Sequence, residues 1–155
     1  MRRSDKEIKD KIIIEEILSN NKILRLALSE DNTPYIIPLN YGYENDCLYF
    51  HSFKEGKKID IIKKNNRASF EVTEKIEIAS SDLACDYGTK YRSVLGVGLI
   101  EIINDSKEKI KGLNVLMKNH TQKREWNYSD TELNKIVVLK LTIKETTGKQ
   151  SGYKD

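Results

Sequence analysis

The stretch LYFHSFKEGKK, residues 48–58, decides the fold, because a strand-forming run of apolar and aromatic residues leads directly into the start of a helix. Ser52 and Glu55 have the Ser-x-x-Glu spacing of a capping box, which predicts that the helix begins here. Lys57 and Lys58 then fall in the first helical turn, where unpaired amides and the helix dipole favour anions over cations. An anion held between these lysines and the amides explains the pattern, and phosphate is the usual candidate; a solvated basic face is the alternative.

The common nucleotide-binding signatures are absent from the chain. A Walker P-loop requires Gly-x-x-x-x-Gly-Lys-Ser/Thr, but His51 stands at the first glycine and Lys58 at the hydroxyl position. The Gly-x-Gly at residues 96–98 lies inside an apolar strand pattern and no helix start follows it. The expected phosphate therefore does not belong to a nucleotide site of either of these two folds.

Composition and charge limit the possible functions. The chain has 155 residues, 33% charged and 38% apolar, which is typical of one soluble domain, residues 1–155, with a sizeable core. A net charge of +3 does not indicate a nucleic-acid partner, and no apolar run is long enough to cross a membrane. Cys47 and Cys85 stand far apart, without metal-ligand spacing, and no secretory signal opens the chain. We therefore expect a cytoplasmic protein with reduced thiols and no metal site.

Hydrophobic periodicity predicts six strands and a few helices. Helices are expected at about 5–19, starting from a capping box at 4–7, at 54–64, from 105 onward and for one turn at 129–132. Strands are expected at 23–28, 35–43, 47–51, 67–73, 91–103 and 135–143, with 74–90 largely loop and 148–155 a polar tail. The first three strands should form an antiparallel meander. The fold class is therefore α+β, and the order of the elements is compatible with a closed antiparallel barrel.

Pro38 stands in the middle of the second expected strand. Proline cannot donate to a strand ladder, so this strand should be an edge, carry a bulge, or face something other than a neighbouring strand. A flat ligand lying against the strand is one explanation, and a plain bulge is the alternative.

Three segments carry a resemblance to a known family: residues 34–43, 48–58 and 91–98, supported by the opening Met1–Arg3 and the closing Thr147–Lys149. In this order and at these separations they resemble the pyridoxamine 5′-phosphate oxidase-like flavoproteins, most closely the branch of 5-nitroimidazole-resistance proteins. The resemblance implies a six-stranded antiparallel split β-barrel with a few flanking helices. It also implies FMN as cofactor and a homodimer with the flavin in a groove at the subunit interface.

The resemblance also implies roles for individual residues. Matched position by position, Pro38, Leu39 and Asn40 would lie along the isoalloxazine ring of the cofactor, and His51 and Ser52 would approach it at a strand end. Gly56, Lys57 and Lys58 would bind the phosphate. Arg92 and Ser93 would line the groove, from either subunit, and Lys149 would lie near the cofactor. His51 is the candidate catalytic residue, since a histidine there could orient a nitro or carbonyl group or supply a proton. A hydrogen-bonded structural histidine is the alternative, and His120 is expected to have no special role.

The leading functional hypothesis is an FMN-dependent oxidoreductase that reduces small electrophilic molecules such as nitroaromatics. The alternative is a non-catalytic module that holds flavin or haem on the same barrel. Pyridoxamine phosphate oxidase activity itself is not expected, because residues 148–155 lack the Arg-Leu-x-Pro ending of those enzymes. RNA binding through the lysines around residues 54–67 is disfavoured by the small net charge and the scarcity of aromatic residues beside them.

Overall fold

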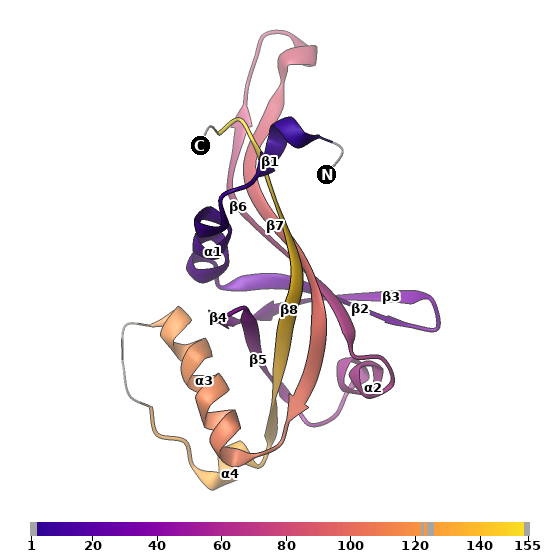
Figure 1. Cartoon of the computed structure of the whole chain (residues 1–155), viewed down its shortest axis with the longest axis vertical. Helices are drawn as coiled ribbons and strands as arrows, with labels where there is room; N and C mark the ends of the chain where they lie inside the picture. The colour runs from indigo at the N-terminus through magenta and orange to yellow at the C-terminus, as the bar shows by residue number, and fades with distance from the viewer. Residues whose placement is uncertain (1–2, 122, 124–125, 154–155) are drawn as a thin grey trace.

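An eight-stranded antiparallel sheet with helices packed around it forms the body of the protein in the computed structural model, which describes residues 3–121, 123 and 126–153 (Figure 1). The strands are β1 (Glu7–Ile8), β2 (Ile23–Glu30), β3 (Thr33–Asn40), β4 (Gly42–Glu44), β5 (Cys47–Phe53), β6 (Arg67–Ala79), β7 (Gly88–Ile103) and β8 (Ile136–Ser151). The helices are α1 (Lys11–Asn20), α2 (Lys57–Lys64), α3 (Ser106–His120) and α4 (Asp130–Leu133), with 3₁₀ turns at Ser4–Lys6 and Ala84–Asp86. The predicted α+β class with an antiparallel sheet is confirmed, although the sheet has eight strands rather than six.

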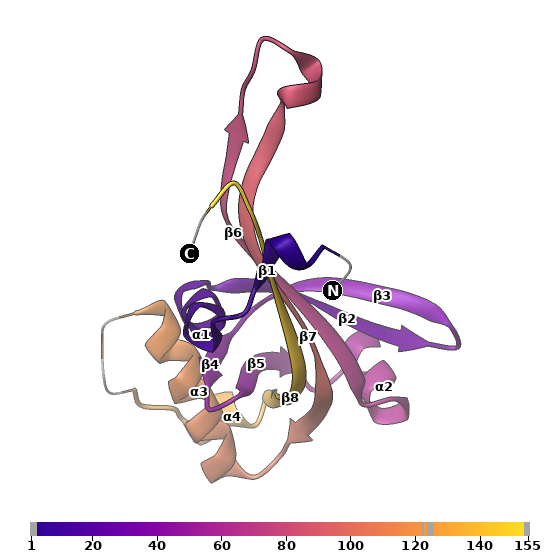
Figure 2. The ribbon, with the colours of Figure 1, turned by 45° about the horizontal axis from the view of Figure 1, so that its top comes forward.

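The two ends of the sheet meet at a single residue, Tyr41. The strand order is β3-β2-β6-β7-β8-β5-β4, with β1 attached to β8, so β3 and β4 lie at opposite ends of the path. Only Tyr41 separates them in the chain, and the sheet must therefore curl until its ends come together (Figure 2). Tyr41 is fully buried, its hydroxyl donates to the Leu18 carbonyl oxygen at 2.6 Å, and its amide donates to the Lys22 carbonyl oxygen at 3.2 Å.

The predicted meander is wrong at this junction. Residues 35–43 do not form one strand, because the chain leaves one end of the sheet after Asn40 and joins the other at Gly42. As a result β5 pairs with β4 and β8 rather than with β3. A hydrophobic pattern records which residues face a core, but not which neighbour supplies the hydrogen bonds, so this crossover left no local signal.

The core lies inside the curled sheet, where alternate residues of the strands face α1 and α2. Fully or nearly fully buried side chains come from β2, β6, β7, β8, α1 and α2, among them Leu24, Leu26, Phe70, Val94, Leu139, Ile17, Leu18, Ile59 and Ile61. A second cluster joins α3 and α4 to the sheet through Leu113, Val115, Leu133, Tyr49 and Val138. Gly42 lets α3 approach closely, because a Cβ there would lie 2.5 Å from the Val115 carbonyl oxygen.

The first helix begins later than predicted. Asp10 is its N-cap and accepts a hydrogen bond from the Ile12 amide at 2.8 Å, whereas the expected capping box at 4–7 forms a 3₁₀ turn. Glu7 and Ile8 instead pair with the end of β8, opposite Lys149 and Gly148. Burial of Ile8, which is 2% exposed, holds this segment against the sheet. The predicted polar tail is accordingly part of β8 as far as Ser151.

The caps predicted for the last two helices are confirmed. Asp105 accepts hydrogen bonds from the Lys107 and Glu108 amides, both at 3.0 Å, and starts α3. Ser129 and Glu132 form a capping box around α4. No helix within the described ranges combines the length and the apolar composition that crossing a bilayer would require.

Beyond the body, β6 and β7 continue as a projecting two-stranded hairpin, residues 75–90, called the arm below (Figures 1 and 2). The arm begins at a bulge between Glu74 and Glu77, where Lys75 adopts a left-handed φ of 51°. Most of this segment was expected to be loop, because charged residues interrupt its strand pattern. The structure shows a paired ribbon from Glu77–Lys90 to Ala79–Gly88, closed by the 3₁₀ turn.

Candidate functional site

Two strands come together with unpaired edges near the junction of the sheet ends. β3 pairs only with β2 among the described residues, so the backbone groups on its other edge have no strand partner. The pairing of β5 with β4 stops at Tyr49, so residues 50–53 have a neighbouring strand only on the β8 side. Free strand edges present backbone N–H and C=O groups that a flat polar ligand can bind.

Pro38, Leu39, Asn40 and His51 line one hollow of about 310 Å³ together with Ile23. The four predicted site residues in this group therefore meet, although ten or more residues of chain lie between His51 and the other three. Pro38 lies in an edge strand, opposite Arg25 of β2, which is one of the arrangements expected for it. An edge tolerates proline because a nitrogen that faces away from the single neighbour needs no N–H.

The start of α2 differs from the prediction in a way that exposes its amides. The helix begins at Lys57 with Gly56 as N-cap, at a φ of 120°, and no side chain caps it. The capping box expected from Ser52 and Glu55 is therefore wrong. Ser52 belongs to β5, where it is 5% exposed, and its hydroxyl accepts a hydrogen bond from the Lys58 ammonium at 2.8 Å. An uncapped helix start carrying two lysines is well suited to an anion.

Lys57 also contacts β3. Its ammonium lies 5.2 Å from the centre of the Tyr35 ring, within the range of a cation–π interaction. The two residues line a hollow of about 210 Å³ with Ile61, Glu30, Asp31 and Thr33. The cationic end of α2 is thereby placed beside the same strand that carries Pro38.

β3 and the segment from β5 to α2 run side by side in opposite directions. At one end His51 shares a hollow with Asn40, and at the other Lys57 shares a hollow with Tyr35. Tyr35 and Pro38 are three positions apart in an extended strand, a distance of about 10 Å. The arrangement is an elongated site. One end has flat, largely apolar walls and free strand edges, and the other end has two ammonium groups and open helix amides.

Arg92, Ser93 and Lys149 lie apart from these hollows. They belong to β7 and β8, and β2 and β6 separate β7 from β3 in the sheet. Ser93 stands opposite Lys149, whose ammonium lies 5.7 Å from the Tyr91 ring centre. The Arg92 guanidinium donates through Nε to the Gln150 side-chain oxygen at 3.1 Å. Within one chain the structure thus forms two groups of predicted site residues and does not join them.

His120, for which the sequence predicts no special role, lies at the end of the helix that packs beside the junction. It ends α3, and its Nε2 is buried without a hydrogen-bond partner among the described residues. Burial, followed by the nearby charge of Lys22, lowers the pKa of His120, and a protonated His51 would lower it further. No group of three or more His, Cys, Asp or Glu side chains that could hold a metal occurs in the described part of the chain. The burial of His120 could not be predicted from the neighbouring residues, because its contacts form only when α3 packs beside the junction.

The side chain before His120 fixes the end of α3 against that junction. The Asn119 amide nitrogen donates to the Asn21 carbonyl oxygen at 2.8 Å and to the Tyr41 carbonyl oxygen at 2.9 Å. Asn40, which lines the first hollow, directly precedes Tyr41. The hollow and the end of α3 are therefore connected through one backbone segment.

A sequence profile of the pyridoxamine 5′-phosphate oxidase family matches residues 10–150, nearly the whole of the chain. The chain belongs to this family. The match confirms the predicted family and includes both strands of the site, α2 and the end of β8. Because the chain belongs to this family, it shares the split-barrel arrangement of strands with the other members. The match does not identify a substrate.

Several solved structures share the fold of this family member. A candidate 5-nitroimidazole antibiotic resistance protein from Bacteroides thetaiotaomicron is 31% identical, with a TM-score of 0.84 over 93% of this chain and 86% of that one. A FAD-binding protein from Mesorhizobium loti is 26% identical, with a TM-score of 0.68 over 92% of this chain and 96% of that one. A FAD- and haem-binding protein from Mycobacterium smegmatis has a TM-score of 0.86 over 96% of this chain and 74% of that one, at 20% identity, which shows the fold alone.

One curated relative also matches the family member in sequence. It is an uncharacterised protein of Rhizobium meliloti, 33% identical over 58 residues. The matched stretch spans 37% of this chain and 38% of the relative.

Proposed function

We propose that this protein binds FMN between β3 and the segment from β5 to α2, and uses it to reduce small electrophilic molecules of the nitroaromatic type. The observation that carries the proposal is the uncapped start of α2, with Lys57 and Lys58 as its first two residues, at one end of a site whose other end is formed by Pro38 and His51. A flavin mononucleotide has a flat ring at one end and a phosphate at the other, which matches this distribution of charge and shape.

The residues present fit the phosphate. Lys58 is oriented by Ser52 and Lys57 by Tyr35, so both ammonium groups are already positioned beside the open amides of α2. Charge-assisted hydrogen bonds to an anion are about twice as strong as neutral ones. Positioning before binding reduces the side-chain entropy lost when the phosphate docks. This end of the site would hold the phosphate of the cofactor.

The ring end fits a flat molecule that one chain covers only in part. Pro38, Leu39 and Asn40 present the free edge of β3, whose backbone groups can bind the polar edge of the ring system. The hollow of about 310 Å³ is near the lower limit of ligand cavities. We therefore propose that a second copy of the chain completes the cover, in a homodimer with the flavin at the subunit interface and with Arg92, Ser93 and Lys149 supplied to the groove across it.

The chemistry follows from the open side of the hollow. FMN supplies reversible electron transfer when bound, while the protein holds it and admits a substrate to one face. The side chain of His51 is exposed and lines the hollow, where it can hydrogen-bond to a nitro or carbonyl oxygen of the substrate or supply a proton. Similarity to a candidate nitroimidazole resistance protein and to a FAD-binding protein supports both the flavin and this class of acceptor. Because Cys47 and Cys85 are free thiols, we also propose a reducing, cytoplasmic location.

Binding of three flavins to the purified full chain tests the cofactor. We expect FMN to bind roughly 10- to 100-fold more tightly than riboflavin, since only FMN has the phosphate that the lysines and amides recognise. The affinity for FAD shows whether the site requires a terminal phosphate or also accepts a diphosphate. The absence of saturable FMN binding would refute the proposal.

Anaerobic reduction of the flavin-loaded protein tests the reaction. We expect a nitroaromatic compound to reoxidise the reduced protein with saturation kinetics and in stoichiometric amounts. Flavin that binds but is not reoxidised by any nitroaromatic or quinone acceptor would instead support the alternative, a non-catalytic flavin-binding module.

A further inference from the structure

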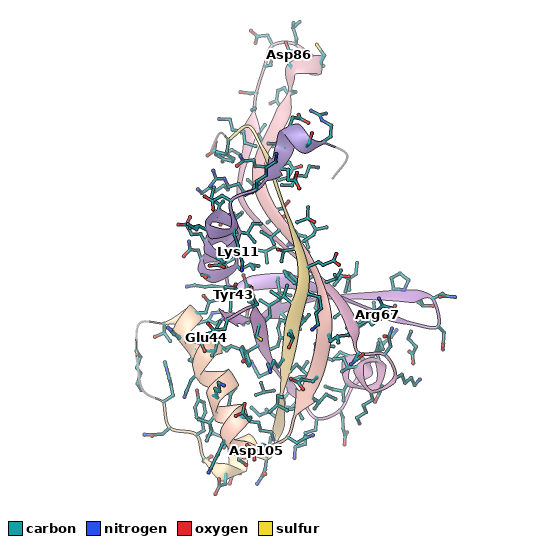
Figure 3. All side chains as sticks on the ribbon, in the orientation of Figure 1. Lys11, Tyr43, Glu44, Arg67, Asp86 and Asp105 are labelled. Carbon is teal, nitrogen blue, oxygen red and sulfur yellow. The ribbon has the colours of Figure 1, made fainter. Side chains whose placement is uncertain are left out.

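Among the described residues no third strand pairs with the arm, and Tyr153 contacts it at its base, at Lys75. Its ribbon consists of three pairs, Glu77–Lys90, Ile78–Thr89 and Ala79–Gly88, and the pairing of β7 with β8 ends just before it at Tyr91. In Figure 3 Asp86 marks the end of the arm, well away from the body of the sheet. A two-stranded hairpin is at best marginally stable in water without a surface to pack on. A surface outside the chain would supply the packing that the arm lacks.

Four large apolar side chains are exposed among the polar residues of the arm. Ile76 is 66% exposed, Ile78 64%, Leu83 61% and Tyr87 56%. Natural proteins usually protect exposed ribbons with charge, because apolar edges promote association. Two of the charged residues of the arm, Lys90 and Glu77, pair with each other at 3.6 Å.

The bulge at the base of the arm determines the face on which Ile78 lies. One extra residue in β6 between Glu74 and Glu77 reverses which side chains point outward, so that Ile78 stands opposite Thr89. Thr89 has the same orientation along β7 as Leu95, because side chains two residues apart share a face. Without the extra residue, Ile78 would point to the opposite face of the ribbon. The Tyr153 hydroxyl donates to the Lys75 carbonyl oxygen at 2.8 Å and holds the bulge in place.

The same face of β7 remains apolar within the body of the sheet. Leu95, Val97 and Leu99 point outward and are 51%, 43% and 42% exposed, whereas their neighbours Val94 and Ile100 are in the core. With the four exposed apolar side chains of the arm these three make seven, and Ile78 shares the face of Leu95. At roughly 100 Å² each they approach the 800 Å² or so that one partner buries in a standard protein–protein interface. A typical monomer has no patch of this size.

We propose that the arm and the outer face of β7 form the contact with a second copy of this chain, each arm lying against the sheet of the other. The inference rests on the homodimer proposed above and specifies its surface. A two-fold contact joins identical patches, so the patch must be complementary to itself. This one is largely apolar, which allows it to contact an identical patch, and Arg25 on the same face is paired with Glu71 at 3.1 Å.

The outer face also provides a place for the apolar side chains of an arm. A hollow of about 490 Å³ lies beside Val97 and Leu99. Its lining includes small side chains of β2 and β6, such as Ala27 and Ser69, and the charged residues Arg67, Lys144 and Glu145. Lys149, opposite Ser93, has the same orientation as Leu95 and so faces the second copy. The contact would thereby bring one of the separated site residues to the partner, whose flavin hollow is open.

Sedimentation of full-length variants at micromolar concentration tests the surface. Ile78→Lys and Leu83→Lys should each raise the dimer dissociation constant at least roughly 100-fold, because a charge replaces an interface side chain that becomes buried. Ile12→Lys is the matched control, since Ile12 is an isoleucine with the same exposed fraction as Ile76, 66%, but lies on α1, away from this face. The control should leave the dimer unchanged.

Hydrogen exchange of the unmodified protein provides a test that does not depend on folding of a variant. The amides of residues 76–89 should be protected at high protein concentration and exchange rapidly on dilution below the dissociation constant. A wild-type dimer that persists in both lysine variants, or an arm that exchanges rapidly at every concentration, would overturn the inference about the arm while leaving the proposed homodimer intact. A wild-type chain that sediments as a monomer would refute both, and flavin binding, measured separately, would still test the cofactor.

Discussion

The ammonium group of Lys58 donates a hydrogen bond of 2.8 Å to the hydroxyl of Ser52, which ties the first turn of α2 to the end of β5. The contact keeps a cation at a helix start where the dipole disfavours it. It also replaces the capping box that the spacing of Ser52 and Glu55 suggests, so the helix amides remain free. These two consequences are the reason that we assign the phosphate of a flavin to this end of the site.

Removing the charge of Lys58 should weaken FMN binding selectively. Lys58→Met deletes a charge-assisted contact worth about 1.5–3 kcal/mol, so the dissociation constant for FMN should rise roughly 10- to 100-fold while that for riboflavin hardly changes. Lys63→Met, at the other end of α2, is the control and should alter neither. Equal losses for FMN and riboflavin would show that Lys58 acts on the fold rather than on the phosphate. Calorimetric titration measures both constants.

Ser52 should contribute to phosphate binding through Lys58. Ser52→Ala frees the ammonium and should weaken FMN binding a few-fold, but the same change should have no effect when Lys58 is already methionine. A double-mutant cycle on FMN affinity measures this coupling, which we expect to be about 0.5–1.5 kcal/mol. Additive effects of the two substitutions would mean that Ser52 does not position Lys58.

His51 should affect turnover more than cofactor binding. His51→Phe removes the hydrogen-bonding and proton-donating side chain at the ring end of the site, and general acid catalysis typically contributes 10²- to 10⁴-fold. We expect kcat for a nitroaromatic acceptor to fall by at least roughly 100-fold, with an FMN dissociation constant within a factor of a few of the wild type. Stopped-flow reoxidation measures the first and fluorescence quenching the second. An unchanged rate would leave His51 with only a structural role.

Gly42 should tolerate no side chain, since a Cβ would lie within 2.6 Å of backbone atoms of Val115 and Leu116. Gly42→Ala must push α3 away from the junction, and we expect a loss of about 1–3 kcal/mol in the free energy of unfolding. Gly88→Ala is the control, because nothing lies within 4 Å of its Cβ position. Urea denaturation compares the two. Equal stability of both variants would contradict the close packing of α3 on β4.

His120 should make folding stability depend on pH. Burial lowers its folded-state pKa below the ordinary 6.5, so between these values the unfolded chain binds a proton that the folded chain does not. Stability should therefore fall as the pH drops below about 6.5, by at most about 1.4 kcal/mol per pH unit from this residue. His120→Gln should flatten the dependence between pH 7 and 5, and an unchanged slope in this variant would contradict its origin in His120. Denaturation curves across this range measure the slope.

Much of the architecture could be predicted from local patterns. Alternation and periodicity located the strands from Ile23, Arg67 and Tyr91 and the helix after Asp105, because burial of one face leaves a regular hydrophobic period. Lys57 and Lys58 indicated an anion for the same local reason, the cost of cations at a helix start. The family itself was recognisable from three segments. Errors arose where one sequence pattern is compatible with two local structures. At residues 4–7 and 52–55 the Ser-x-x-Glu spacing predicts a capping box, but none forms there.

What the chain alone determined is which residues face a core and where the charge at the start of α2 is unusual, since both depend on neighbours within a few positions. Only the tertiary structure decided that the sheet ends meet at Tyr41, that His51 lies beside Asn40, and that a one-residue bulge turns Ile78 to the face of Leu95. Each of these depends on hydrogen-bond partners or registers between segments distant in the chain. Such pairings are selected by the packing of the whole core and leave no trace in the spacing of nearby residues.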